Sequence, residues 1–145
     1  MATLDDAIAI GRRERFLAVV STVRADATIQ SSVVSAGVLA HPVTGEQVVG
    51  FVTYGRAKIA NLRARPQVTV NFRADGEWVS VEGRAELSGP GDPYPGVDQE
   101  RLRLLLREIF QAAGGSHDNW AVYDQVMAEQ QRVAVLVTPT RVYSN

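Results

Sequence analysis

A series of short β-branched runs, most of them separated by breaks too short for a crossover helix, is the feature that most constrains this chain. The clearest case is centred on Asp75-Gly76, a dipeptide typical of tight hairpin turns. Before this turn, Val68, Val70 and Phe72 alternate with polar residues, which predicts a strand with one buried face. Strands joined by turns this short pair in an antiparallel arrangement.

The same pattern predicts the elements of the whole chain. Strands are expected at residues 16–23, 29–39, 48–54, 67–72, 78–87 and 133–137, with Pro139 breaking the last strand and residues 141–143 continuing its edge. Helices are expected at residues 4–15, 56–65 and 98–113, and from a cap at Ser116 or Asn119 to about residue 131. We therefore predict a mainly β (α+β) fold: a six-stranded antiparallel split β-barrel with peripheral helices, in a single domain spanning residues 1–145.

Composition narrows the classes of function. The chain has 145 residues, no cysteine and a net charge of -1, which excludes a thiol nucleophile and gives no support for nucleic-acid binding. Its first residues are polar and acidic, unlike a signal peptide, and no apolar run approaches the roughly 20 residues of a membrane helix. We expect a cytoplasmic protein that acts on a small-molecule substrate, with no nucleic-acid or membrane partner.

No side-chain catalyst is visible in the sequence. His41 and His117 are the only histidines, and neither has a serine, a carboxylate or another histidine at motif spacing. A catalytic triad or a metal site is therefore not expected. If the protein is an enzyme, its chemistry is expected to come from a bound cofactor that the chain binds and orients.

The segment 52–66 indicates where such a cofactor would lie. A strand ends near Tyr54, Gly55 turns the backbone, and a helix begins with Arg56 and Lys58 in its first turn. Two cations at the positive end of a helix dipole are unfavourable unless an anion is bound, and the free N–H groups of a helix start suit a phosphate. From spacing alone, a phosphate site and a pair of solvated surface charges are equally compatible with this segment.

Polar residues in the second strand give a weaker indication. Ser31, Ser32 and Ser35 lie among apolar residues, which predicts one polar strand face, either beside a ligand or facing solvent. Trp78, which opens the fifth strand, is compatible with a core position or with an aromatic plate for a planar ligand. On these residues alone, solvent and core are the favoured interpretations.

Taken together, several segments resemble the pyridoxamine-phosphate-oxidase-like split-barrel family, in its coenzyme F420-dependent branch. In residues 56–66 a basic residue, a lysine two positions later, Asn-Leu, further basic residues and a proline follow the third strand. Residues 78–86 end in Gly-Arg-Ala-Glu, while residues 117–123 and 132–143 resemble the family's late helix and closing strand. The order and spacing of these segments are more specific than any one of them.

The resemblance implies a homodimer with two cofactor sites at the subunit interface. It places the cofactor against the second strand, the end of the third strand and the following helix start, with the phosphate at the two basic residues of that helix. The corresponding residues of this chain are Ser32, Val33, Val34, Ser35, Val52, Thr53, Tyr54, Arg56, Ala57 and Lys58. Trp78 is implied to approach the cofactor's ring system.

Two departures from the family pattern bear on the choice of cofactor. Pyridoxamine-phosphate oxidases proper hold the FMN phosphate with a basic residue on the second strand, where this chain has Gln30 and serines. They also have a C-terminal substrate-binding extension, whereas this chain stops at Asn145. Both departures favour F420, a deazaflavin with an oligoglutamate tail. Candidate cations for that tail are Arg12, Arg13, Arg15, Arg63 and Arg65.

The leading hypothesis is a homodimeric oxidoreductase that passes hydride from reduced F420 to an electron-poor organic substrate such as a quinone, an enone or a tetrapyrrole. An FMN-binding oxidoreductase on the same fold is the first alternative. A non-catalytic carrier of F420, FMN or another ligand is the second.

Overall fold

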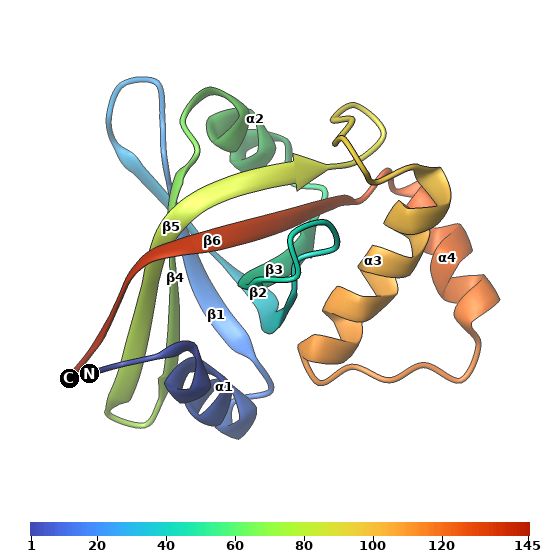
Figure 1. The fold of residues 1–145 in the computed structure, drawn as a ribbon. Helices are drawn as coiled ribbons and strands as arrows, with labels where there is room; N and C mark the ends of the chain where they lie inside the picture. Colours follow the sequence, from blue (N-terminus) through green and yellow to red (C-terminus); the bar gives the residue numbers. More distant parts are fainter.

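The computed structural model describes residues 1–145 as a closed barrel flanked by helices (Figure 1). The strands close in the order β1-β2-β3-β6-β5-β4, and all six neighbouring pairs are antiparallel. The strands are β1 (Leu17–Val23), β2 (Ile29–Ala40), β3 (Gln47–Thr53), β4 (Gln67–Ala74), β5 (Glu77–Ser88) and β6 (Val133–Ser144). The helices are α1 (Leu4–Arg13), α2 (Arg56–Ala64), α3 (Gln99–Ala112) and α4 (Trp120–Glu129). The predicted six-stranded antiparallel barrel with peripheral helices is confirmed.

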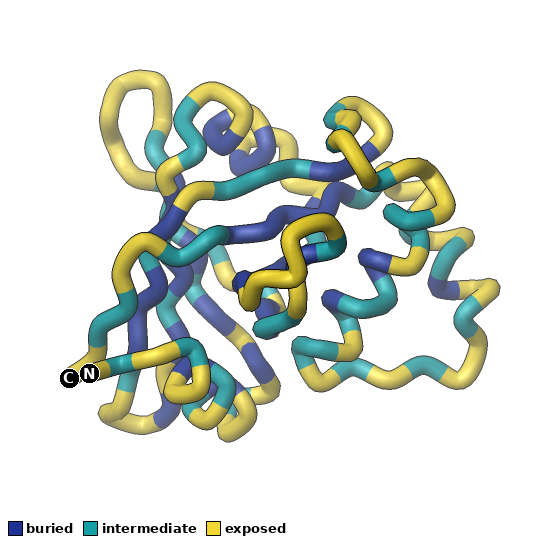
Figure 2. Tube along the Cα trace, in the orientation of Figure 1, coloured by how far each residue is buried: buried dark blue, intermediate teal, exposed yellow.

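Alternation along the strands fills the barrel. Val68, Val70 and Phe72 of β4 are all buried, as the sequence predicts, and the antiparallel register sets Val70 opposite Val81 of β5. These residues belong to a cluster of 14 buried residues that also includes Phe51 of β3. Figure 2 shows the buried positions recurring along the strands, with the exposed positions concentrated in the turns and helices.

The last strand corrects one prediction. β6 continues through Pro139 instead of breaking there. Pairing of β6 with β3 ends at Val137. Pro139 lies beyond this pairing, so its missing N–H costs no hydrogen bond to β3. On the other side, the pairing shifts register between Glu82 and Gly83, and a Cβ at Gly83 would lie only 2.2 Å from the Thr138 carbonyl oxygen. A bulge and a glycine therefore let the strand pass the proline.

A second packing layer lies outside the barrel. Figure 1 shows α3 and α4 together on one side of it, and seven buried residues form a separate cluster there: Val48, Leu105, Leu106, Ile109, Tyr123, Ala134 and Leu136. α3 ends close against β2, since a Cβ at Gly37 would lie 2.4 Å from the Ala112 backbone. Tyr123 attaches α4 to α3 by donating its hydroxyl to the Leu106 carbonyl oxygen at 2.9 Å. The two helices thus form a wall beside β2 and β3.

The helices are short, and none is long and apolar enough to cross a membrane. At the start of α1, the Thr3 N–H donates to Asp6 Oδ2 at 2.7 Å, which satisfies one free donor of the first turn. The helix ends at Arg13 rather than at the predicted Arg15, because Arg15 and Phe16 adopt positive φ angles of 56° and 59°. The chain turns there into β1.

Candidate functional site

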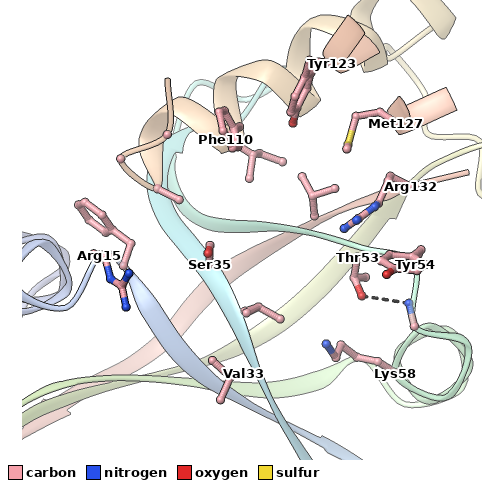
Figure 3. Close-up of a pocket in the computed structure, with 18 of the residues that line it drawn as sticks. Arg15, Val33, Ser35, Thr53, Tyr54, Lys58, Phe110, Tyr123, Met127 and Arg132 are labelled. Carbon is pink, nitrogen blue, oxygen red and sulfur yellow. Dashed lines mark hydrogen bonds between the residues drawn. The ribbon is translucent and has the colours of Figure 1, made fainter. Parts of the chain in front are cut away.

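A groove lies between the outer faces of β2 and β3, the start of α2 and the α3–α4 wall. Its volume is about 970 Å³, within the range of cofactor and small-molecule sites. Figure 3 shows side chains from these elements pointing into one space, with Phe110, Tyr123 and Met127 on one side and Val33 and Lys58 on the other. The wall is therefore mostly apolar and aromatic where the helices form it.

Every charged side chain that lines the groove is a cation. Arg12 and Arg15 come from the end of α1 and the turn after it, Lys58 from α2, and Arg132 from the residue before β6. No aspartate or glutamate is among the lining residues, although the chain as a whole has a net charge of -1. Cations gathered around a partly enclosed hollow produce a positive potential that favours an anionic ligand.

Lys58 is the least exposed of these cations. The residue is 8 % exposed, and its ammonium lies 5.8 Å from the centre of the Phe51 ring. Burial lowers the pKa of Lys58, and no carboxylate is near enough to raise it. A desolvated ammonium without a counter-ion is unfavourable, so a bound anion would stabilise this arrangement.

Ser32 independently indicates a missing partner close to Lys58. Its Oγ is buried and has no hydrogen-bond partner. On the same face of β2, Gln30 accepts a hydrogen bond from Asn61 of α2 at 3.2 Å, and Val34 lines the groove. Because side chains alternate along a strand, Ser32 lies between these two, beside the turn of α2 that contains Lys58. A buried hydroxyl without a partner, on the side of β2 that α2 covers, suits a phosphate oxygen.

The start of α2 adds backbone donors. Gly55 is the N-cap, and no side chain caps the helix. Thr53 Oγ1 accepts a hydrogen bond from the Gly55 N–H at 3.2 Å, drawn as a dashed line in Figure 3, which fixes the turn from β3 into α2. The first turn, from Arg56 through Lys58, contains no acidic residue. Its N–H groups remain available to an anion.

The groove brings together most of the residues that the sequence assigns to the cofactor. Those that line it are Val33, Val34, Ser35, Val52, Thr53, Tyr54 and Lys58. Arg56 and Ala57 are exposed at the adjoining start of α2. The expectation of one polar face on the second strand does not hold, because the alternation leaves Ser31 and Ser35 exposed and turns Ser32 to the other side.

Trp78 lies outside the groove. It is half-buried on β5, edge-on to the Tyr143 ring with the centroids 6.0 Å apart. A shallow hollow on this part of the surface is lined by Trp78, Tyr143 and Asn71, and the side-chain amide of Asn71 donates to Ser80 Oγ at 2.8 Å. Within one chain, Trp78 is therefore neither part of the barrel core nor part of the groove.

The structure separates the candidate tail cations into two groups. Arg63 makes a two-pronged ion pair with Asp92, at 2.8 and 2.7 Å, and Arg65 donates to a backbone carbonyl oxygen of β1 at 2.8 Å. These two arginines serve the fold. Arg12 and Arg15, by contrast, line the groove.

The junction between α1 and β1 holds Arg15 at the groove. Arg15 and Phe16 are consecutive residues in the left-handed region, which costs about 1–2 kcal/mol each. The Phe16 ring is buried against α1 at Gly11, where a Cβ would lie 2.9 Å from it. Arg13 points away from the groove to an ion pair with Asp75 at 3.1 Å. Two arginines that are close in the sequence therefore differ in role, since Arg15 lines the groove and Arg13 forms an ion pair.

Arg132 was not indicated by the sequence. Its guanidinium carbon lies 3.9 Å from the centre of the Tyr54 ring, and both residues line the groove. The two are far apart in the chain and meet only because β3 pairs with β6. No local motif marks a contact of this kind.

A second polar cluster, also not indicated by the sequence, lies away from the groove. His41 is buried, and its Nδ1 accepts hydrogen bonds from the Val43 and Thr44 N–H groups at 3.1 and 3.2 Å. Its Nε2 lies 3.1 Å from Glu86 Oε1. Tyr94 donates to the other Glu86 oxygen at 2.6 Å, which raises the pKa of Tyr94 to about 12. Because each group has a partner, we interpret this cluster as structural.

A closed antiparallel barrel with a cationic groove beside its second and third strands defines a class of small barrel proteins with a site for an anionic ligand. The chain belongs to the pyridoxamine 5'-phosphate oxidase family, whose model matches residues 4–145. The resemblance noted in the sequence is therefore confirmed at the level of the family. This family includes flavin-binding oxidoreductases.

Solved structures share the fold at low sequence identity. A conserved hypothetical protein from Mycobacterium tuberculosis is 20% identical, with a TM-score of 0.67 over 99% of this chain and 84% of that one. An F420 reductase is 22% identical, with a TM-score of 0.57 over 89% of this chain and 90% of that one. A pyridoxamine 5'-phosphate oxidase-related, FMN-binding protein from Nostoc punctiforme is 14% identical, with a TM-score of 0.67 over 99% and 84%.

Proposed function

We propose that this chain is a coenzyme F420-dependent oxidoreductase that passes hydride from the reduced cofactor to an electron-poor organic substrate. The observation that carries the proposal is the groove, whose charged lining residues are all cations. Lys58, which lines this groove, has no counter-ion, and the buried Ser32 Oγ has no hydrogen-bond partner. F420 combines a planar ring with several anionic groups, which matches a groove that combines an apolar wall with unpaired cations.

We assign the cofactor phosphate to the start of α2. Lys58 supplies the charge, the free N–H groups of the first turn supply directed donors, and Ser32 supplies a hydroxyl donor. Arg56, exposed at the same turn, adds a second cation on the solvent side. Each charge-assisted hydrogen bond of this kind contributes roughly 1.5–3 kcal/mol.

The distribution of cations supports F420 over FMN. The two cofactors share a tricyclic ring, a ribityl chain and a phosphate, but only F420 continues into a tail of carboxylates. Arg12 and Arg15 line the same groove as Lys58 and supply charge beyond a single phosphate. The family resemblance implies a cation on the second strand in pyridoxamine-phosphate oxidases proper, whereas here the Gln30 side chain is bonded to Asn61.

The ring system is assigned to the middle of the groove, along β2 and the end of β3. When bound, F420 supplies a hydride, which the substrate accepts together with a proton from solvent. The residues of this chain bind and orient the ring, and Phe110, Tyr123 and Met127 keep water from one side of it. An FMN-binding oxidoreductase is the second candidate, because an FMN-binding protein has the same fold.

The proposal includes a homodimer that completes the groove. Val33 is 64% exposed on β2 and pairs with Val19 of β1, so an apolar patch continues along the outer barrel face. The same cross-strand row runs on through Asn71 and Ser80 to Tyr143, next to Trp78. Because Val33 also lines the groove, a second copy on this face would border the cofactor and bring its own Trp78 near the site.

Light scattering tests the dimer. We expect a dimer mass at about 5 μM protein, and a monomer for Val33→Glu, which places a charge in the apolar patch. A folded wild-type monomer at this concentration contradicts the dimer, but it leaves the groove within one chain intact.

Isothermal titration with F420 and FMN tests the cofactor. We expect F420 to bind at least about tenfold more tightly than FMN in about 50 mM salt, with the advantage shrinking at about 300 mM salt as the tail carboxylates are screened. Lys58→Met should weaken both cofactors, whereas the double variant Arg12→Gln/Arg15→Gln should weaken F420 selectively. Arg84→Gln, an exposed cation outside the groove, is the matched control and should change neither.

Each other outcome selects an alternative. An FMN affinity equal to or above that of F420 overturns the F420 assignment and supports the flavoprotein. Tight F420 binding without oxidation of the reduced cofactor by any of a panel of quinones, enones and tetrapyrroles identifies a carrier.

A further inference from the structure

Arg132 occupies a fixed position at the end of α4. Its backbone N–H donates to the Met127 carbonyl oxygen at 3.0 Å, and the preceding Gln131, at φ 50°, donates to the Ala128 carbonyl oxygen at 3.1 Å. This pair of bonds is the usual way in which a left-handed residue closes a helix. The side chain of Arg132 therefore projects from a rigid base into the groove, as Figure 3 shows.

The guanidinium of Arg132 is oriented but not neutralised. It lies over the Tyr54 ring, and its Nε donates to Gln130 Oε1 at 2.8 Å. None of the ion pairs in the structure includes Arg132. A guanidinium stacked on an aromatic ring keeps its edge free, and that edge matches the two oxygens of a carboxylate.

The surroundings of Arg132 differ from those of Lys58. Arg132 and Met127 also line a second hollow, of about 620 Å³, between α3 and α4. Arg132 thus lines both the groove and this hollow, and the groove wall also includes Phe110 and Tyr123. Lys58 comes instead from α2 and lies against the Phe51 ring. The groove therefore offers two cations with different neighbours, a buried ammonium and a guanidinium stacked on Tyr54.

We propose that Arg132, held flat on Tyr54, binds a carboxylate of the hydride-accepting substrate, which is accordingly a planar apolar molecule with an anionic edge. This inference rests on the proposed function, because it assumes that Lys58 is taken by the cofactor phosphate. The aromatic wall contacts the face of the substrate, and the guanidinium fixes its orientation through the carboxylate.

A matched pair of redox-inert probes tests this site. 2-Naphthoate and 2-naphthamide share a planar ring system and differ in the carboxylate. We expect the wild-type protein to bind 2-naphthoate at least about tenfold more tightly than 2-naphthamide in low salt, by isothermal titration. Arg132→Gln should remove this preference, and Tyr54→Leu, which keeps the cation but removes its platform, should reduce it. Arg84→Gln, the exposed cation outside the groove, should leave the preference intact.

Saturation with F420 separates the two anion positions. We expect 2-naphthoate to bind the F420-saturated protein with the same preference, because the probe requires Arg132 and the cofactor phosphate requires Lys58. Competition between them, equal binding of the two probes, no binding of either, or a preference that survives in both Arg132→Gln and Tyr54→Leu each overturns the inference. If the protein fails to bind F420 while the Arg132-dependent preference is present, the proposed cofactor is wrong and the carboxylate site stands.

Discussion

The inside of the barrel and the groove beside it use the same strands in opposite ways. Inside, 14 buried residues form one apolar cluster. Outside, the groove is lined by cations that form no ion pair with a carboxylate. Neighbouring residues of β3 show the contrast, since Phe51 lies in the buried cluster and Val52 lines the groove. Alternate residues of one strand thus serve stability on the inner face and ligand binding on the outer face. The binding face can be recognised because its charged groups have no carboxylate partners within the chain.

The prediction with the largest expected effect compares a phenylalanine-to-alanine substitution inside the barrel with one in the groove wall. Phe72→Ala, inside the barrel, should lower the free energy of unfolding by about 3–5 kcal/mol, because it leaves a cavity that the closed sheet cannot fill. Phe110→Ala, in the half-buried groove wall, should cost less than about half as much, since solvent or neighbouring rings can occupy the space. Urea unfolding measures both. Equal losses would show that the α3–α4 wall is as much part of the stabilising core as the barrel.

A polar group that has a charged hydrogen-bond partner, unlike the cations of the groove, should contribute to the stability of the fold. Tyr94 donates to Glu86, so Tyr94→Phe should lower the free energy of unfolding by about 1.5 kcal/mol, at the low end for a bond to a charged group because the Glu86 side chain is 39% exposed. The pKa of Tyr94 is raised to about 12 by this bond. Its contribution is therefore complete below pH 10, the unfolded value, and is lost as the pH rises to about 12.

The comparison of wild type with Tyr94→Phe at high pH isolates this residue. Burial also raises the pKa of Tyr123 to about 12, but Tyr123 is present in both proteins and cancels in the difference. The gap in unfolding free energy should narrow between pH 10 and pH 12. A constant gap over this range would show that the stability difference between the two proteins does not come from the bond that the Tyr94 hydroxyl donates to Glu86.

The smallest effect on stability is expected at Lys58. Lys58→Met should change the unfolding free energy of the ligand-free protein by less than about 1 kcal/mol, or stabilise it, because it removes a desolvated charge that has no partner. Since burial lowers the pKa of Lys58 below its ordinary 10.5, the unfolded chain holds this proton more tightly than the folded chain does. The penalty is full below the folded-state pKa and disappears as the pH rises to 10.5.

Urea unfolding near neutral pH and at pH 10 tests Lys58. The wild type should gain stability relative to Lys58→Met as the pH rises, since only the wild type sheds the buried charge. A large loss of stability in Lys58→Met near neutral pH would show that the lysine serves the fold, and it would remove the main reason to place a phosphate there.

The strands could be predicted from the sequence because their signal is local. The alternation of Val68, Val70 and Phe72 states which face is buried without reference to any other strand. The passage of β6 through Pro139 could not be predicted in the same way. It depends on where pairing with β3 ends and on Gly83 of β5, which only the closed barrel brings together.

The residues of the site also divide into those with a local sequence signal and those that only the fold brings together. Lys58 was found because a cation at a helix start is unfavourable without an anion, and that signal lies within a few residues. The resemblance named Ser32 and Ser35 of the second strand, but only the structure separates them, since Ser35 lines the groove and Ser32 faces the other side with its Oγ unpartnered. Arg132 carries no local signal, because only the pairing of β3 with β6 brings it over the Tyr54 ring.

Closure of the barrel also has a kinetic consequence. β3 and β6 pair Val49 with Val137, so the last contact of the ring joins residues from opposite halves of the chain. The chain between these residues must lose conformational entropy before the pairing can stabilise it. Proteins dominated by such non-local strand pairs fold in about milliseconds to seconds. Until β6 arrives, the other strands form an open sheet with β3 and β5 as unprotected edges. We therefore expect the docking of β6 to limit the folding rate and to end the period in which the chain is most prone to aggregate.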